Sequence, residues 1–170
     1  MEAARRRAEE LGIRDVVVAS TTGETGLKAC KVFKGYNLVI VRHHTGFTKP
    51  GYQEMSPELE GRITESGAKI LTATHAFAGI ERGIRKKFGV RGILELMAHT
   101  LRLFGEGMKV CVEIALMAAD AGLIPVDREV ISIAGTGRGA DTVIVVKPAH
   151  TSNFFDLQIR EIVAMPREKG

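Results

Sequence analysis

Residues 16–26 read VVVASTTGETG, a short apolar run followed by a loop of glycines and small hydroxyl-bearing residues. The apolar run is typical of a strand, and the residues after the loop place Leu27, Cys30 and Phe33 at helical spacing before Gly35. Glycine between a strand and a helix lets the backbone approach a ligand, and the first free amides of the helix point at negative charge there. The stretch therefore predicts a strand–loop–helix unit with an anion site in its loop.

A second glycine loop, GTGRGADT, occupies residues 135–142. Apolar runs precede and follow it, so this loop is expected to link two strands. Phosphate bound there requires the turn amides and Arg138, because a guanidinium clamps phosphate with two parallel hydrogen bonds. Asp141 has two interpretations, a contact with a ligand hydroxyl or hydrogen bonding within the turn. Neither loop closes with Gly-Lys-Ser/Thr and no GxGxxG opens a helix, so a nucleoside triphosphatase has little support.

The alternation of patterns along the chain predicts an α/β fold. A helix ends near Gly12, and Ser56-Pro57 marks the start of another, with a hydroxyl to cap it and proline at its first position. Repeated βαβ units produce a mostly parallel sheet with helices on both faces, and the tight links near the end of the chain favour at least one antiparallel pairing. Strands are expected near residues 15–19, 36–42, 69–72, 130–134, 142–146 and 157–164, with a purely helical region near 79–122.

One helix of that region, residues 111–120, is apolar on nearly every side. Such a helix is either buried or lies in a subunit interface. Glu113 and Asp120 share one of its faces, and because a buried carboxylate is costly unless it is paired, we expect hydrogen-bonded carboxylates there and no catalysis.

Composition bounds the class of protein. A chain of 170 residues predicts one domain, and 45% hydrophobic with 26% charged residues is ordinary for a folded protein. The net charge is +4, yet the charges are mixed in sign and RNA-reading aromatic motifs are absent, so no nucleic-acid partner is expected. Cys30 and Cys111 fall among apolar residues, which predicts buried thiols in a reducing compartment and no metal site. The charged start and the interrupted apolar helix predict a cytoplasmic protein without a membrane partner.

Histidines follow two of the expected strands. His43 and His44 end one strand and His75 follows the next, at the sheet edge where open α/β folds bind ligands. Strand alternation predicts that His44 faces this site with His75 and that His43 faces elsewhere, while His150 either joins the pocket or orders its own turn. His44 and His75 are the candidates for binding phosphate, which is the expected role, or for acid–base work near neutral pH.

These residues carry a family resemblance. The element order and the two glycine loops resemble the C-terminal α/β domain of pyruvate kinase. The chain more closely resembles a stand-alone prokaryotic family that is similar to that domain. This resemblance lies in the runs HTGF at 44–47, KVCVEI at 109–114, MAADAGLIP at 117–125, GADT at 139–142 and PAH at 148–150. The resemblance implies a three-layer α/β/α sandwich around a mixed, mostly parallel sheet, a homo-oligomer, and a phosphorylated ligand, with flavin mononucleotide (FMN) associated with this group.

The chain departs from the family pattern in two ways. Such proteins usually open with an additional strand, whereas this sequence begins within the first helix, so we expect a single domain over residues 1–170 that lacks that strand. Glu24 adds negative charge to the first loop, which disfavours a bisphosphate. Pyruvate kinase activity is not expected, because its phosphoryl-transfer site lies in a separate barrel that alone needs roughly 250 residues.

Three functions stay open. The first is a small-molecule binding protein that holds a phosphorylated ligand, with FMN, a nucleotide and a sugar phosphate all open; a flavin ring would rest against Phe47, Tyr52, Phe77 or aliphatic side chains. The second is a flavin-dependent or hydrolytic enzyme that uses His44 or His75. The third is an oligomeric regulatory scaffold acting through the apolar helix. The candidate ligand-binding residues are Ser20, Thr21, Thr22, Gly23, Thr25, His44, Thr45, Gly46, Phe47, Thr74, His75, Gly135, Thr136, Gly137, Arg138, Gly139, Ala140, Asp141 and Thr142.

Overall fold

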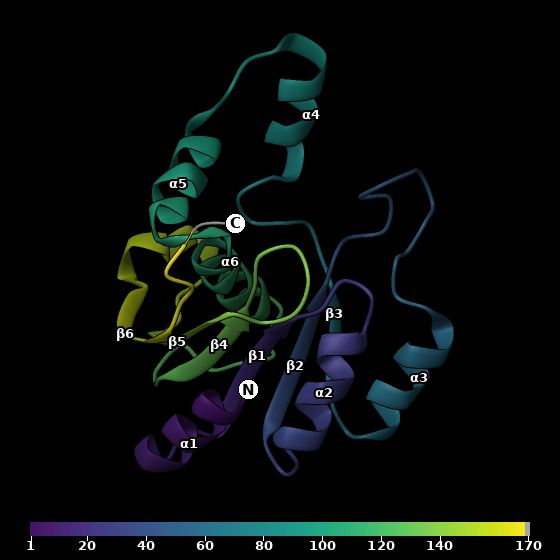
Figure 1. Ribbon diagram of the computed structural model, residues 1–170. Helices are drawn as coiled ribbons and strands as arrows, with labels where there is room; N and C mark the ends of the chain where they lie inside the picture. The colour runs from purple at the N-terminus through teal and green to yellow at the C-terminus, as the bar shows by residue number, and fades with distance from the viewer. Residues whose placement is uncertain (169–170) are drawn as a thin grey trace.

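The computed structural model describes residues 1–168 and shows an α/β protein built on one six-stranded sheet (Figure 1). The last two residues of the predicted domain, 169 and 170, lie outside the described residues. The elements in chain order are α1 (Glu2–Leu11), β1 (Asp15–Ala19), α2 (Glu24–Val32), β2 (Asn37–Arg42), α3 (Pro57–Glu65), β3 (Lys69–Thr72), α4 (Gly79–Phe88), α5 (Ile93–Leu101), the 3₁₀ turn η1 (Arg102–Phe104), α6 (Glu106–Asp120), β4 (Val130–Ala134), β5 (Thr142–Lys147), the 3₁₀ turn η2 (Thr151–Asp156) and β6 (Gln158–Ala164).

The sheet is mixed and mostly parallel, as expected. Its strand order is β3-β2-β1-β4-β5-β6, in which β3, β2, β1 and β4 pair in parallel. The hairpin from β4 to β5 and the pairing of β5 with β6 are antiparallel, because the links between these strands are too short for a crossover. The carboxyl ends of the first four strands therefore lie at one edge of the sheet.

Helices cover both faces, and side-chain alternation divides the core in two. Val16 and Val18 of β1 join the core under α1, α2 and α3, whereas Val17 joins the core under α6. The parallel register aligns Val17 with Val39 of β2, so neighbouring strands present their side chains to the same layer. The predicted three-layer α/β/α sandwich is confirmed.

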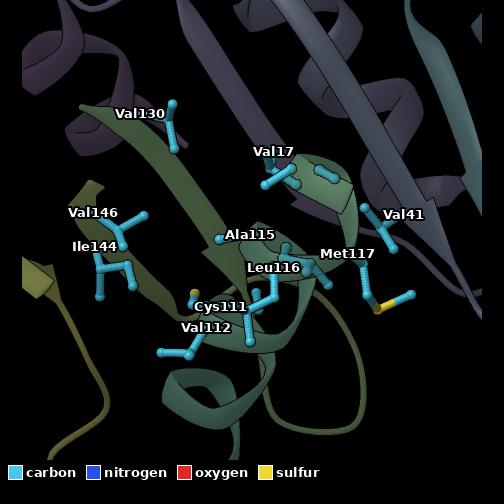
Figure 2. Close-up of a cluster of buried hydrophobic side chains, with 14 of the residues drawn as sticks. Val17, Val41, Cys111, Val112, Ala115, Leu116, Met117, Val130, Ile144 and Val146 are labelled. Atoms are coloured by element: carbon cyan, nitrogen blue, oxygen red, sulfur yellow. The ribbon is translucent and has the colours of Figure 1, made fainter. Parts of the chain in front are cut away.

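Helix α6 is the centre of the second core (Figure 2). Its residues from 107 to 119 are buried apart from the partly exposed Val110, and Cys111, Ala115 and Leu116 pack against the valines and isoleucines of the sheet. Of the two sequence interpretations for this helix, a core helix or a subunit interface, the structure shows the core helix. A scaffold that acts through α6 would have to expose it, so that form of the third hypothesis is wrong.

Local signals explain why the elements begin and end where they do. Ser56 accepts a hydrogen bond from the Leu59 amide, with Pro57 at the first helical position of α3, as predicted. Gly12 ends α1 in a left-handed conformation, with φ of 69°. Gly23 has φ of 101°, and a Cβ there would lie 3.0 Å from the Leu59 Cβ, so the first loop needs glycine for its turn and for close packing on α3.

Candidate functional site

A cavity of about 680 Å³ opens at the carboxyl edge of the parallel strands. Its volume lies within the usual range for small-molecule sites, about 300–1,000 Å³. Both glycine loops border it, because they follow β1 and β4, which are hydrogen-bonded neighbours. Its lining comprises Ala19, Ser20, Thr21, Thr22, Glu24, Thr25, Val41, Arg42, His43, Phe47, Glu54, His75, Phe77, Ala78, Glu81, Arg82, Arg85, Glu95, Ala98, Arg102, Glu106, Lys109, Val110, Glu113, Ile114, Met117, Gly135, Gly137, Arg138 and Gly139.

The first loop turns directly into the amino end of α2. Ser20 Oγ accepts a hydrogen bond of 2.9 Å from the Gly26 amide, so this hydroxyl is used to hold the loop on the helix. The amides of Glu24 and Thr25 belong to the first turn of α2 and have no acceptor within the helix. These amides, the positive end of the helix dipole and the threonine hydroxyls of the loop form the type of surface that binds an anion.

The second loop is held by a carboxylate beneath it. Asp141 accepts hydrogen bonds from the Thr136 amide at 2.8 Å and from the Thr142 hydroxyl at 2.6 Å. Partial burial raises the pKa of Asp141, but these hydrogen bonds outweigh it and hold the pKa below its ordinary value. Gly135 allows the loop to close, because a Cβ there would lie 2.5 Å from the Gly139 carbonyl oxygen. Of the two roles expected for Asp141, ligand contact or hydrogen bonding within the turn, the structure shows hydrogen bonding within the turn.

Arg138 extends from the exposed tip of this loop and borders the cavity. Most other cations of the lining already have carboxylate partners: Arg42 binds Glu60, Arg85 binds Glu95, Arg102 binds Glu106, and Lys109 binds Glu113. Within residues 1–168, Arg138 and Arg82 have no carboxylate partner within 4.0 Å. They are the two lining cations whose charge is not neutralised by a carboxylate contact.

Aromatic rings form one wall of the cavity. The rings of His43 and Phe47 are stacked with centroids 3.8 Å apart, and the His75 ring lies 5.1 Å from that of Phe47. The Arg82 guanidinium lies over the Phe47 ring, with its Cζ 3.9 Å from the centroid. These contacts bring three parts of the chain together in one wall: α4, the turn after β2, and the segment after β3.

The histidine that reaches the cavity from the turn after β2 is His43 and not His44. Strand alternation predicts the opposite, but β2 ends at Arg42, so the alternation does not continue through these two residues. His43 Nδ1 lies 2.7 Å from Glu54 Oε2, and His43 Nε2 lies 3.4 Å from the Thr21 hydroxyl. A ring nitrogen that donates to a carboxylate leaves the other nitrogen as an acceptor, so this chain of groups is able to take a proton from a hydroxyl.

A buried ion pair lies deeper in the cavity. Lys109 Nζ donates to Glu113 Oε2 at 2.5 Å, and Glu113 Oε1 accepts from the Phe77 amide at 2.9 Å. The two side chains are 9% and 3% exposed. Lysine at i and glutamate at i+4 share one face of α6, so the helix itself brings the charges together and offsets part of the cost of burying them.

His75 lies beside this pair, with its Nδ1 3.7 Å from Glu113 Oε2. Burial lowers the pKa of His75 to about 4, and the attraction of Glu113 only partly opposes the shift. The imidazole is therefore neutral at pH 7. Its Nε2 is buried without a hydrogen-bond partner within residues 1–168, so the hydrogen-bonding capacity of this atom is unused.

The predicted site residues divide into those that line the cavity and those that lie outside its lining. Those that line it are Ser20, Thr21, Thr22, Thr25, Phe47, His75, Gly135, Gly137, Arg138 and Gly139. Those outside the lining are Gly23, His44, Thr45, Gly46, Thr74, Thr136, Ala140, Asp141 and Thr142. Phe77, proposed as a ring platform, borders the cavity, whereas Tyr52 does not.

Asp120 and His150 lie away from the cavity. Asp120 accepts hydrogen bonds from the amide and hydroxyl of Thr151, and His150 lies 3.3 Å from the same carboxylate. Asp120 and Glu113 are therefore two separate hydrogen-bonded carboxylates, as expected, and His150 orders the turn into η2.

Three of the lining residues that sequence reasoning missed are the charged Lys109, Arg82 and Glu54. Lys109 carried a usable signal, because a lysine four residues before a glutamate in an otherwise apolar helix predicts a buried pair. Arg82 and Glu54 follow no periodic pattern, and their positions depend on how α4 and the segment after β2 fold over the sheet edge.

Two further observations bound the chemistry. Within residues 1–168, no group of three or more His, Cys, Asp or Glu side chains is arranged to hold a metal ion. Burial raises the pKa of Cys111 to about 12, so this thiol stays protonated inside the core.

The helices of the described chain are all too short or too polar to span a lipid bilayer.

The family assignment follows from a comparison with known protein families. The family model described as the pyruvate kinase alpha/beta domain matches residues 1–146. The chain belongs to this family. The matched range contains every residue that lines the cavity, so the site of this pyruvate kinase alpha/beta domain is built entirely from its shared region.

The depressed pKa of His75 predicts a pH-dependent stability. The unfolded chain binds a proton on His75 near pH 6.5, whereas the folded chain does so near pH 4. The contribution of the neutral His75 ring to the free energy of unfolding is therefore fully present above pH 6.5. It is lost as the pH falls toward 4, and the total loss is about 3 kcal/mol. We expect the difference in unfolding free energy between the wild type and His75→Gln to shift against the wild type across this window, measured by urea denaturation. A difference that does not change with pH would contradict the buried neutral histidine.

Proposed function

We propose that this domain binds a phosphorylated small molecule, with the phosphate held between the two glycine loops. The observation that carries the proposal is the convergence of these loops on one cavity, which is bordered both by the first turn of α2 and by Arg138, a cation without a carboxylate partner within residues 1–168. Backbone amides and a guanidinium are the groups that recognise phosphate most often.

A monophosphate suits this site better than a denser anion. Glu24 and Glu54 bring negative charge to the cavity beside the first loop, and four of the lining cations are already paired. One phosphate would lie against Arg138 and the α2 amides, whereas a bisphosphate would bring further negative charge close to these carboxylates and add repulsion.

The rest of the ligand would lie along the aromatic wall. His43, Phe47 and His75 give a wall of rings suited to a planar group, and a carbonyl or ring N–H that reached the buried, unpartnered His75 Nε2 would supply its missing hydrogen bond. FMN has both parts, a monophosphate and a planar heteroaromatic ring with carbonyl groups, and is our candidate ligand. The homo-oligomer that the family resemblance implies is part of the same proposal.

Thermal melts test the proposal. FMN at a hundred times its dissociation constant should add about 2.7 kcal/mol of stability, and therefore raise the melting temperature by roughly 5–10 °C. Riboflavin, which lacks the phosphate, should shift it far less. Arg138→Gln should weaken FMN binding by about tenfold or more, because it removes a charge-assisted hydrogen bond.

Arg62→Gln is the matched control, because Arg62 is an exposed arginine of α3 outside the cavity. It should bind FMN as the wild type does. Equal shifts with FMN and riboflavin, or equal affinities for wild type and Arg138→Gln, would contradict a phosphate-anchored site.

A second candidate function rests on one specific arrangement, the Thr21–His43–Glu54 chain. Its order of hydroxyl, imidazole and carboxylate is that of an activated nucleophile or water, and the ring of His43 is oriented by both Glu54 and Phe47. Hydrolysis of an ester is the reaction this arrangement would support, with His43 as the general base in place of the His44 or His75 expected from sequence.

Chromogenic esters test this second candidate. If His43 acts as a base, hydrolysis of p-nitrophenyl acetate or p-nitrophenyl phosphate should fall by about a hundredfold in His43→Gln and by less in Glu54→Gln. His99→Gln, an exposed histidine of α5 outside the cavity, is the control and should keep the wild-type rate. No turnover above buffer, or a rate unchanged in His43→Gln, would rule this function out.

A further inference from the structure

Residues 79–104, which we name the α4–α5 arm, extend away from the sheet at the top of Figure 1. Large apolar side chains are unusually exposed here: Ile80 is 84% exposed and Ile93 is 73% exposed. The exposed apolar residues of α4, of the link to α5 and of α5 are Ile80, Ile84, Phe88, Val90, Ile93 and Leu96.

Helix α4 is amphipathic, and its apolar face points away from the cavity. Ile80, Ile84 and Phe88 follow one another at intervals of four residues and so form one face, yet no residue of α4 is buried. Arg82 is two residues from both isoleucines and therefore lies on the opposite side of the helix, where it contacts Phe47 in the cavity wall. A helix of ten residues is marginal in water by itself, so an uncovered apolar face points to a binding partner.

The arm also carries the net charge of the protein. Residues 79–104 hold six Lys and Arg against two Glu, a net charge of +4, and the whole chain has the same net charge. The rest of the chain therefore has equal numbers of basic and acidic side chains. Three of the six cations are exposed and lie outside the cavity lining: Lys86, Lys87 and Arg91.

The lysines are placed beside the apolar face and are not neutralised within the arm. Lys87 is seven residues after Ile80 and so lies next to it on the helix surface, and its Nζ is 5.4 Å from the centroid of the Phe88 ring. Lys86 and Lys87 have no carboxylate partner within residues 1–168. A lysine in such a position covers apolar surface with its stem and extends its ammonium toward a polar boundary.

We propose that the α4–α5 arm binds the surface of an anionic lipid bilayer, with Ile80, Ile84 and Phe88 in the acyl boundary and the exposed lysines against the headgroups. A short basic helix with one apolar face and a strongly charged remainder is typical of helices that lie in the plane of a membrane interface. An anionic bilayer complements both the uncovered apolar face and the concentrated positive charge.

Other partners complement only one of these two properties. Nucleic acid would pair with the cations and leave the apolar face in water. A second copy of the arm would cover the apolar face but would bring the same cations of two chains together, and like charges repel. The homo-oligomer of the proposed function would then form through another surface.

The position of the arm suits a flat partner. Because the arm extends from the body of the domain, a planar surface is able to reach α4 without meeting the sheet or the helices that cover it (Figure 1). The sequence prediction of no membrane partner concerns segments that span or target, and a helix that lies in the plane of the interface is a separate case. Membrane binding of the arm does not rest on the proposed function.

Co-sedimentation with vesicles tests the charge and the apolar face separately. The wild type should bind vesicles of phosphatidylcholine and phosphatidylserine at a ratio of about 7:3, and should bind pure phosphatidylcholine far more weakly. Lys86→Gln/Lys87→Gln should weaken binding to the mixed vesicles by about thirtyfold, because each cation near an anionic surface contributes about fivefold. Ile80→Gln/Ile93→Gln keeps the charge and should weaken binding by about tenfold or more.

Each pair of substitutions has a matched control outside the arm. Lys28→Gln/Lys31→Gln removes two exposed lysines of α2, and Phe155→Gln removes a 91% exposed phenylalanine. Both controls should bind the mixed vesicles as the wild type does, and far-UV circular dichroism checks that every variant is folded.

Tryptophan fluorescence reports whether the apolar face enters the lipid. The chain has no tryptophan, so Phe88→Trp places a single reporter on the face and Phe155→Trp places one outside the arm. Emission of the Phe88→Trp protein should shift to shorter wavelength with phosphatidylserine-containing vesicles, whereas emission of the Phe155→Trp protein should not.

Three results would overturn the proposal. The first is a wild type that does not bind the mixed vesicles, and the second is binding that the arm substitutions leave unchanged. The third is a lipid-free oligomer, seen by sedimentation velocity, that Ile80→Gln/Ile93→Gln dissociates, because the arm would then be covered by a second copy.

Discussion

The parallel pairing of β1 with both β2 and β4 is the constraint on which the site depends. Val17 of β1 is in register with Val39 on one side and with Ser132 on the other, so the three strands end at the same edge. The loops that follow β1 and β4 therefore lie next to one another, although more than a hundred residues separate them in sequence. A one-residue slip in either pairing would reverse the side chains between the two cores and separate the loops from their supports.

Charge in the cavity is arranged so that most of it is neutralised by the protein itself. Glu113 neutralises Lys109 and Glu95 neutralises Arg85. Asp141 is used to hold the second loop. Arg138 is left facing the cavity from a loop tip. A cavity whose charges are mostly paired, with Arg138 and Arg82 as its two unpaired cations within residues 1–168, favours a ligand with one strongly anionic group and an otherwise neutral body.

Sequence reasoning predicts this fold well, because local signals mark its elements. The Ser56-Pro57 cap, the left-handed Gly12 and the apolar runs of the strands each act through neighbouring residues, so they can be recognised without the tertiary structure. Topology then follows from short links and right-handed crossovers. The convergence of the two glycine loops is accessible to the same reasoning, since both follow strands that end at one edge.

The side chains around the loops are less predictable. His43 reaches the cavity because it follows the last residue of β2, Arg42, and strand alternation does not determine the direction of side chains beyond the end of a strand. Arg82 contacts Phe47 only because the tertiary structure brings α4 next to the turn after β2. The apolar face of α4 has clear helical spacing in the sequence, but the spacing does not reveal that the chain leaves this face uncovered.

Backbone amide NMR measures the central claim most directly. In a titration of the isotope-labelled protein with FMN, phosphate held between the loops predicts the largest amide shifts at Thr22–Thr25 and Gly137–Gly139, in parallel and with one dissociation constant. Riboflavin should leave these amides near their free positions. If FMN shifts only one loop, or if both loops stay unchanged while other residues respond, the two loops do not form a common phosphate site.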